Sequence, residues 1–182
     1  QGTATAAQLC AGEWSVSITS GACDTTLSFT IVEPTPIAVN LVTTDASCPG
    51  VCDGAATATA IGGTGLLSYT WSPVPATGQG TASVTGLCTG AHTLTVADAS
   101  GCDTTLTFTI IEPLPITATS AQTDVTCGNL CDGTASVVVS GGTPGFTYLW
   151  TPAPATGQGT PSATGFCAGP VNVLITDANG CT

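Results

Sequence analysis

Basic residues are absent from this sequence. Its 182 residues contain no lysine and no arginine, against 11 aspartates and glutamates, so the formal net charge at pH 7 is −11. Nucleic-acid binding needs basic side chains that displace counterions from phosphate, and Schiff-base chemistry or an isopeptide crosslink needs a lysine amine. These functions are excluded, and we expect no nucleic-acid partner. Salt bridges to lysine or arginine contribute nothing to the fold.

Long hydrophobic runs are also absent. Apolar residues make up 42% of the chain, but they alternate with threonine and never approach the run of about 18 that a transmembrane helix requires. We therefore expect no membrane span in this segment. Alternation with a period of two instead predicts short β-strands, most clearly at 92–96 and 106–110. No segment has the periodicity of a helix.

What the sequence does contain is a repeat with a period of 79 residues. The segment Asp24–Pro34 returns almost unchanged as Asp103–Pro113. A fixed period of this size indicates one folding unit copied in series. We expect a piece of a longer array, with the C-terminal part of a first repeat over 1–34, a complete repeat over 35–114, and a third repeat, lacking its last strand, over 115–182.

The complete repeat has the pattern of a small β-sandwich. Alternation predicts strands at about 37–43, 55–61, 66–72, 82–87, 92–97 and 104–111, separated by glycine and proline turn signals. Short strands of this number, with a tryptophan on the third, favour an immunoglobulin-like sandwich. The expected fold is therefore all-β, with tandem immunoglobulin-like domains. Paired prolines in Glu33–Pro36 and Glu112–Pro115 predict short, stiff linkers between them.

Ten cysteines in such small repeats predict disulfide bonds. A unit of this size buries roughly 60–65% of its unfolded surface, so its core alone is marginal. Disulfide-stapled domains belong to oxidising compartments, so we expect an extracellular location. The strand that begins near 55 is expected to lie antiparallel to the one that ends near 87. This arrangement pairs Cys52 with Cys88 and, by repetition, Cys131 with Cys167. A metal site is disfavoured, because no second close pair completes a tetrahedron.

The remaining cysteines of the second and third repeats leave two alternatives open. Cys48 pairs either with Cys102 of its own repeat or with Cys181 of the next repeat, across the proline linker. The second pairing would lock neighbouring domains together. Cys127 is the repeat equivalent of Cys48 and shares its alternatives.

An ordered set of motifs identifies a known family. The chain resembles the SprB repeat in Cys48-x3-Cys-Asp-Gly54, Gly62-Gly-Thr64, Ser68-Tyr-Thr-Trp71, Gly86-Leu-Cys-x-Gly90, Asp98-x-x-Gly-Cys102 and Ile111-Glu-Pro113. The resemblance covers essentially the whole chain. It implies a secreted protein of the gliding-motility type, made as a giant tandem-repeat polypeptide at the cell surface. It also implies adhesion or filament structure, and no enzymatic activity.

His92 and the aromatic pairs are the obvious candidates for chemistry, but each has a simpler structural interpretation. The repeat equivalents of His92 are Trp14 and Val171, where the family usually has tyrosine, so this position belongs to the core. We expect no catalytic residue and no cofactor. Two aromatic pairs, Tyr69 with Trp71 and Tyr148 with Trp150, could stack sugars if exposed, but a sandwich tryptophan is usually buried.

O-glycosylation and calcium binding are two further hypotheses for the surface. Thr25 and Thr104 follow aspartate in a short pattern that resembles the O-glycosylation sites in secreted proteins of gliding bacteria. Glu33, Glu112, Asp45 and Asp124 fall near the domain junctions and are weak calcium candidates, without the dense ligand loop that calcium usually has.

These observations favour one function and leave two alternatives. We expect a fragment of the stalk of a tandem-repeat adhesin or surface filament, with neighbouring repeats of the same chain as partners and possible contact with surface polysaccharide. The first alternative is a short subunit of a non-covalent filament, in which a second copy donates a copy of the strand at 24–32. The second is a carbohydrate-binding module of a secreted enzyme, which requires exposed aromatics.

Overall fold

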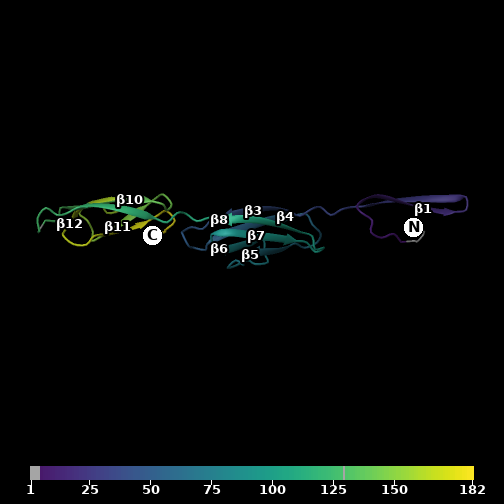
Figure 1. Ribbon diagram of the computed structural model, residues 1–182, viewed down its shortest axis with the longest axis horizontal. Coiled ribbons are helices and arrows are strands. Elements are labelled where there is room, and N and C mark those ends of the chain that lie inside the picture. The colour runs from purple at the N-terminus through teal and green to yellow at the C-terminus, as the bar shows by residue number, and fades with distance from the viewer. Residues whose placement is uncertain (1–4, 129) are drawn as a thin grey trace.

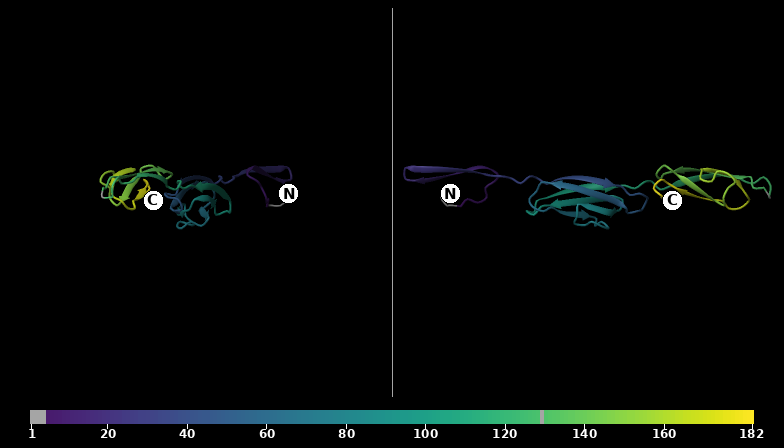
Figure 2. Two further views of the ribbon diagram at one scale, coloured as in Figure 1. Left: turned by 60° about the vertical axis from the view of Figure 1, so that its left-hand side comes forward. Right: turned by 180° about the vertical axis from the view of Figure 1, so that it is seen from behind.

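Strands account for all the regular secondary structure of the residues that the structure describes. The computed structural model describes residues 5–128 and 130–182, and over these residues it contains β-strands and no helix. The strands form three groups that follow one another in a row (Figures 1 and 2). The all-β fold with the expected period is therefore confirmed.

The middle group is a sandwich of two three-stranded antiparallel sheets. One sheet has the order β3-β4-β6 and the other the order β5-β7-β8. The strands are β3 (Ala38–Thr44), β4 (Gly54–Ile61), β5 (Ser68–Ser72), β6 (Ser83–Leu87), β7 (Gly90–Ala97) and β8 (Asp103–Ile110). Their bounds lie within a few residues of those predicted by the alternation of apolar side chains.

The third group repeats this plan with one strand fewer. Its strands are β9 (Thr117–Thr123), β10 (Gly133–Ser140), β11 (Thr147–Thr151), β12 (Ser162–Phe166) and β13 (Asn172–Thr176), in the sheets β12-β10-β9 and β11-β13. The first group is a single hairpin of β1 (Gly12–Ser20) and β2 (Cys23–Ile31). By the repeat, β1 and β2 correspond to β7 and β8.

A buried tryptophan organises the core of the middle repeat. Trp71 is 2% exposed, and its indole Nε1 donates a hydrogen bond of 2.9 Å to the carbonyl of Thr81. It packs with buried apolar side chains of both sheets, including Leu94 and Val84. Each such side chain contributes about 1.5–3 kcal/mol when fully buried. The core is confined to the interior of one repeat, so each complete sandwich has its own.

The turn signal Thr77-Gly-Gln-Gly80 has a second role that sequence reasoning missed. The side-chain amide of Gln79 receives a hydrogen bond from the Trp71 amide and donates one to its carbonyl, both at 3.1 Å. Gln79 thereby completes the backbone pairing at this end of β5. Gln158 makes the same pair of bonds to Trp150 in the third repeat. The repeated Gly-Gln-Gly was the signal for this clamp.

A glycine allows the turn after β4 to pack closely against the backbone of the linker. Gly62 has a φ of +85°, and a Cβ placed on it would collide with the carbonyl oxygen of Pro36. Gly141 has the same relation to Pro115 in the third repeat. Because the next amide, that of Gly63, donates 2.8 Å to the Thr35 carbonyl, the linker is held against the turn after β4.

We predict that Gly62→Ala destabilises the middle repeat far more than Gly101→Ala. Both glycines have a left-handed φ, +85° and +84°, but a Cβ on Gly101 meets open space. The left-handed conformation alone costs about 1 kcal/mol for alanine, and overpacking at Gly62 adds about 1–3 kcal/mol. Thermal unfolding followed by tryptophan fluorescence measures the difference. If the two variants lost equal stability, the close approach of Gly62 to Pro36 would contribute nothing to the stability of the repeat.

Candidate functional site: the junction between repeats

A disulfide joins the middle and third repeats. Cys48 lies in the loop that follows β3, and Cys181 lies in the turn that follows β13. Their Cα atoms are 5.7 Å apart although their sequence separation is 133. Figures 1 and 2 show the C-terminus on the side of the third repeat that faces the middle one. Of the two pairings left open by the sequence, the structure has the one between repeats.

The loop that carries Cys48 is held by carboxylates. Asp53 accepts hydrogen bonds from the amide of Ser47, at 2.9 Å, and from its hydroxyl. These bonds, the hydroxyl first, hold the pKa of Asp53 below its usual value. The loop presents Cys48 in a defined position because both ends of the segment from Ser47 to Asp53 are tied together.

Two further carboxylates tie this loop to the linker. Asp45 Oδ1 accepts the amide of Ile111 at 3.0 Å, and Glu112 Oε2 accepts the amide of Gly50 at 2.7 Å. Ala46 also donates 3.0 Å to the Ile111 carbonyl. Asp45 and Glu112, two of the weak calcium candidates, are therefore used as acceptors of backbone hydrogen bonds.

The turn that carries Cys181 is organised by a buried aspartate. Asp177 Oδ2 accepts the Thr143 amide at 2.8 Å, and Oδ1 accepts the amides of Asn179 and Cys181, both at 2.9 Å. The Thr143 bond is the main reason that the pKa of Asp177 lies below its usual value, while burial acts in the opposite direction. The carboxylate shapes the turn and orients the Cys181 backbone toward the neighbouring repeat.

Direct contacts across the junction surround the disulfide. The side-chain amide of Asn179 donates 2.9 Å to the carbonyl of Ser47. Sγ of Cys181 lies 3.3 Å from the same oxygen, and as part of a disulfide it has no proton to donate. Cys181 is 8% exposed, so the crosslink is largely covered. Sequence reasoning missed Ser47, although Ser47 and Thr126 both stand six residues before an aspartate.

Each sandwich also carries an internal disulfide. Cys52 bonds to Cys88 and Cys131 bonds to Cys167, both with Cα atoms 3.9 Å apart. These pairs are the ones that the strand order suggested. The reason is the antiparallel pairing of β4 with β6, which places Gly54 opposite Leu87. Both cysteines of the Cys52–Cys88 bond are exposed.

Four cysteines have no disulfide partner within the described residues. They are Cys10, Cys23, Cys102 and Cys127, and all four are exposed. Cys102 and Cys127 are the repeat equivalents of the two cysteines bonded at the junction.

His92 lies inside the middle sandwich. It is 7% exposed and stacks on Phe108 with ring centroids 5.4 Å apart. Its Nε2 lies 2.8 Å from the Cys88 carbonyl, which accepts only, so Nε2 carries the proton. Nδ1 is buried without a hydrogen-bond partner in the described residues. This environment is that of a core residue.

The aromatic pairs do not form an open platform. Trp71 and Trp150 are buried at 2% and 3% exposure, and Tyr69 and Tyr148 are half-buried against the same cores. Stacking on a sugar requires a free aromatic face, which the tryptophans do not offer.

The two threonines proposed for glycosylation differ in exposure. Thr25 is exposed on β2, whereas Thr104 is half-buried on β8. Thr104 shares the face of β8 that includes Phe108 and the buried Ile110. Glycosylation of either remains a prediction, with more room for a sugar at Thr25.

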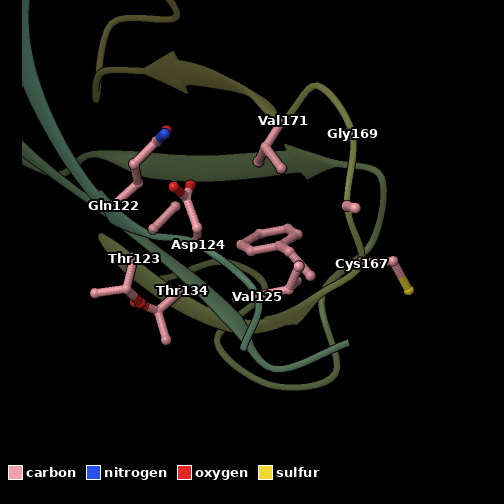
Figure 3. Close-up of a pocket in the computed structure, with 12 residues that line it drawn as sticks. Gln122, Thr123, Asp124, Val125, Thr134, Cys167, Gly169 and Val171 are labelled. Carbon is pink, nitrogen blue, oxygen red and sulfur yellow. The ribbon is translucent and has the colours of Figure 1, made fainter. Parts of the chain in front are cut away.

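The third repeat has a pocket of about 230 Å³ at one end of the sheet β12-β10-β9 (Figure 3). Asp124, Val125 and Val171 line it. Phe166 also lines it. At the equivalent place in the middle repeat, a Cβ on Gly54 would meet the side chain of Ile110 at 2.9 Å. The pocket is thus the space that the end of β8 fills in the complete sandwich.

Neither a metal cluster nor a membrane helix is found in the part of the chain that the structure describes. Over these residues no group of three histidine, cysteine, aspartate or glutamate side chains is placed to hold a metal ion. No helix there has the length and apolarity needed to span a membrane. The other two calcium candidates, Glu33 and Asp124, belong to no such group.

Comparison with known proteins gives one family. A model of the SprB repeat matches residues 40–76 and again residues 119–155. The matches begin one period apart, and each runs from the first strand of its repeat past the strand with the buried tryptophan. A search of curated proteins found no match.

We predict that Asp177→Asn lowers the thermal midpoint of the third repeat by several degrees at neutral pH. The variant keeps one acceptor oxygen and points an NH₂ group at backbone donors. The control is Asp103→Asn, which removes the same charge from an exposed strand position. A fall of the same size in the control would mean that charge alone, and not the turn, is responsible.

The aspartates that accept hydrogen bonds in the loops and turns predict that stability falls in acid. The folded-state pKa values of Asp53, Asp98, Asp132 and Asp177 are lowered. Their contribution is therefore fully present above the unfolded value of about 3.9 and is lost as the pH falls through the lower folded values. Thermal midpoints should be flat near neutral pH and fall below about pH 4. A midpoint unchanged down to pH 2 would contradict this.

Proposed function

The chain is a SprB-type repeat protein, and we propose that it forms part of the stalk of an extracellular adhesin or surface filament. The repeat is of the kind found in cell-surface proteins, and the disulfides fit an extracellular location. The proposed role is mechanical. The repeats set the reach of the stalk, and many copies provide avidity for whatever surface it contacts.

The observation that carries this proposal is the disulfide between consecutive repeats. A stalk must transmit tension from repeat to repeat, and a proline linker alone is a single covalent connection between two domains. Cys48–Cys181 gives the junction a second covalent connection, and Asn179 adds a direct hydrogen bond to Ser47. A catalytic domain has no need for this arrangement, whereas a load-bearing one does.

The proposal is tested by finding the protein and measuring its size. Antibodies against the chain, applied to intact cells without permeabilisation, should label the surface or filaments attached to it. Intact mass under denaturing, reducing conditions should then be many times the 17.7 kDa of this segment. Labelling that appears only after permeabilisation would refute the surface role.

A second candidate is a subunit that polymerises by strand donation, in which β2 of one copy pairs with β13 of another. In the described residues β13 pairs only with β11, whereas its equivalent β7 also pairs with β8. The pocket of about 230 Å³ marks where such a strand would end. β2 has nearly the sequence of β8, so a second copy supplies a matching strand.

The first hairpin shows the apolar face that such an exchange would cover. Trp14, Val16 and Phe29 are 38%, 45% and 45% exposed, whereas the equivalents of the first two, His92 and Leu94, are buried in the middle repeat. The intact mass separates the two candidates. A reduced mass near 17.7 kDa, with assembly at native pH, would favour strand donation over a covalent array.

The two sandwiches do not support the carbohydrate-binding alternative. It requires exposed aromatic faces, and the tryptophans of both sandwiches are buried. Contact of the array with a surface polysaccharide would involve the loops or another part of the protein.

We predict that the junction disulfide limits extension under force. When the oxidised chain is pulled from its ends, the 133-residue separation between Cys48 and Cys181 is closed by the bond. At about 3.4 Å per residue, this hides roughly 450 Å of extended chain, which reduction releases. Single-molecule force spectroscopy measures the difference.

A matched pair of variants isolates the junction. Cys48→Ser should give an intermediate extension, because Cys52–Cys88 and Cys131–Cys167 each still close a separation of 36. Cys10→Ser removes an unbonded cysteine and should leave the extension unchanged. An oxidised chain that extends as far as the reduced one would overturn the mechanical role of the bond.

A further inference from the structure

The middle and third repeats carry, at their two outer ends, the repeat equivalents of the junction cysteines, and these have no disulfide partner. Cys102 stands at the start of β8, as Cys181 stands one period later, and Cys127 follows β9 as Cys48 follows β3. The bonded pair is covered, with Cys181 8% exposed and Cys48 half-buried, whereas Cys102 and Cys127 are exposed. Each unbonded cysteine is therefore accessible to a further protein surface.

The loop that carries Cys127 has the same local hydrogen bonds as the bonded loop that carries Cys48. The Thr126 amide and hydroxyl donate to Asp132 at 3.0 and 2.5 Å, as those of Ser47 donate to Asp53. The Leu130 amide donates 3.0 Å to the Cys127 carbonyl, matching the equivalent bond to Cys48 at 3.1 Å. No rearrangement of these contacts is needed for a bond like that of Cys48.

The half-site around Cys102 is equally complete. Asp98 Oδ1 accepts the Cys102 amide at 2.9 Å and Oδ2 accepts the Thr64 amide at 2.8 Å. Asp177 makes the same bonds to Cys181 and Thr143. The side chain differs at Ser100, which stands where Asn179 reaches across the junction.

We propose that Cys102 and Cys127 are inter-repeat disulfide sites, each bonding the matching cysteine of an adjoining repeat. Cys102 takes the first cysteine of a Cys-x3-Cys-Asp-Gly loop, and Cys127 takes the cysteine of an Asp-x-x-Gly-Cys turn. The inference rests on the proposed tandem array. The evidence for it is the Cys48–Cys181 bond, which joins residues of these same two types in this structure.

Cys102 and Cys127 are not partners of each other within one chain. Cys102 lies at the end of the middle repeat that adjoins the 33–36 linker, and Cys127 lies at the far end of the third repeat. Strands of seven or eight residues make each sandwich roughly 25 Å long, so two sandwiches separate the thiols far beyond the Cα distance of about 6 Å that a disulfide allows.

The bond forms by ordinary thiol–disulfide exchange. One cysteine thiolate attacks an oxidised dithiol catalyst or a small-molecule disulfide, forming a mixed disulfide and releasing one thiol. The partner thiolate then displaces the second donor sulfur. The two protein thiols lose two protons and two electrons, and the donor disulfide is reduced to two thiols.

A disulfide at every junction would give the array two covalent routes. β3 leads from the 33–36 linker to Cys48, and β8 leads from Cys102 to the 112–115 linker. At a junction, the linker connects the last strand of one repeat to the first strand of the next repeat. The disulfide instead connects the first strand of the one repeat to the last strand of the next. A route that follows the first strand of one repeat therefore follows the last strand of the next, and the reverse. β4 to β7 lie on neither route.

The test is a disulfide map of the protein as secreted, with no reductant at any step. Free thiols are alkylated in denaturant, and the chain is cut after aspartate and glutamate because it has no site for trypsin. This isolates Cys102 in peptide 99–103 and places Cys127 with Cys131 in peptide 125–132. Both cysteines should be unlabelled, with peptide 99–103 linked to a peptide that contains Cys-x3-Cys. Alkylated Cys102 or Cys127, or a link between Cys102 and Cys23, would overturn the proposal.

Two comparisons sharpen the result. Non-reducing and reducing denaturing gels identify the source of the partner, because an unchanged mass places it on the same chain and a fall in mass places it on a second copy. Cys102→Ser should create one new alkylated thiol, on the first cysteine of the preceding Cys-x3-Cys loop, whereas Ser100→Ala should create none. No new thiol in Cys102→Ser would also refute the bond.

The outcome is separable from that of the proposed function. A free Cys102 in a protein that antibodies still find at the cell surface overturns the crosslink and leaves the stalk standing. A crosslinked protein found only inside cells overturns the stalk instead.

Discussion

Backbone amides take the place of basic side chains in this protein, and the ends of its repeats depend on them. With no lysine or arginine, a carboxylate can be stabilised only by N–H and O–H donors. Asp53 and Asp177 are stabilised in this way, and the loops that they organise carry Cys48 and Cys181. Removing the charge from these carboxylates therefore loosens the segments that position the crosslink, which makes the junction an electrostatic structure as well as a covalent one.

The crosslinks compensate for a limited core. Each sandwich has one small set of buried apolar residues around a tryptophan, and a repeat of this size buries a modest share of its surface. The internal disulfide restricts the unfolded chain, an effect of about 3–4 kcal/mol for a loop of this length. The disulfide between repeats acts at another level, because it couples neighbouring domains whose cores remain separate.

Comparison of the repeats within one chain separates what is structural from what varies. Trp71 and Trp150 make the same indole hydrogen bond, and Gly62 and Gly141 make the same close approach to the linker. The position of His92 is filled by tryptophan and valine in the other copies, so its burial beside Phe108 is a packing solution particular to one repeat. The constant features are those that close a sandwich and present a cysteine at each end, which suits a structural repeat.

The sequence by itself determined the β class, the period and the approximate strand bounds, because alternation with period two and glycine–proline turns are local signals. The strand order implied by the sandwich also suggested Cys52–Cys88, since paired strand ends bring these residues together. Only the tertiary structure decided between Cys102 and Cys181 as the partner of Cys48. That choice depends on how the loop after β3 of one repeat meets the turn after β13 of the next, and no local pattern encodes a contact across a sequence separation of 133. For the same reason, the roles of Ser47 and Asn179 emerged only when the two repeats were seen in contact.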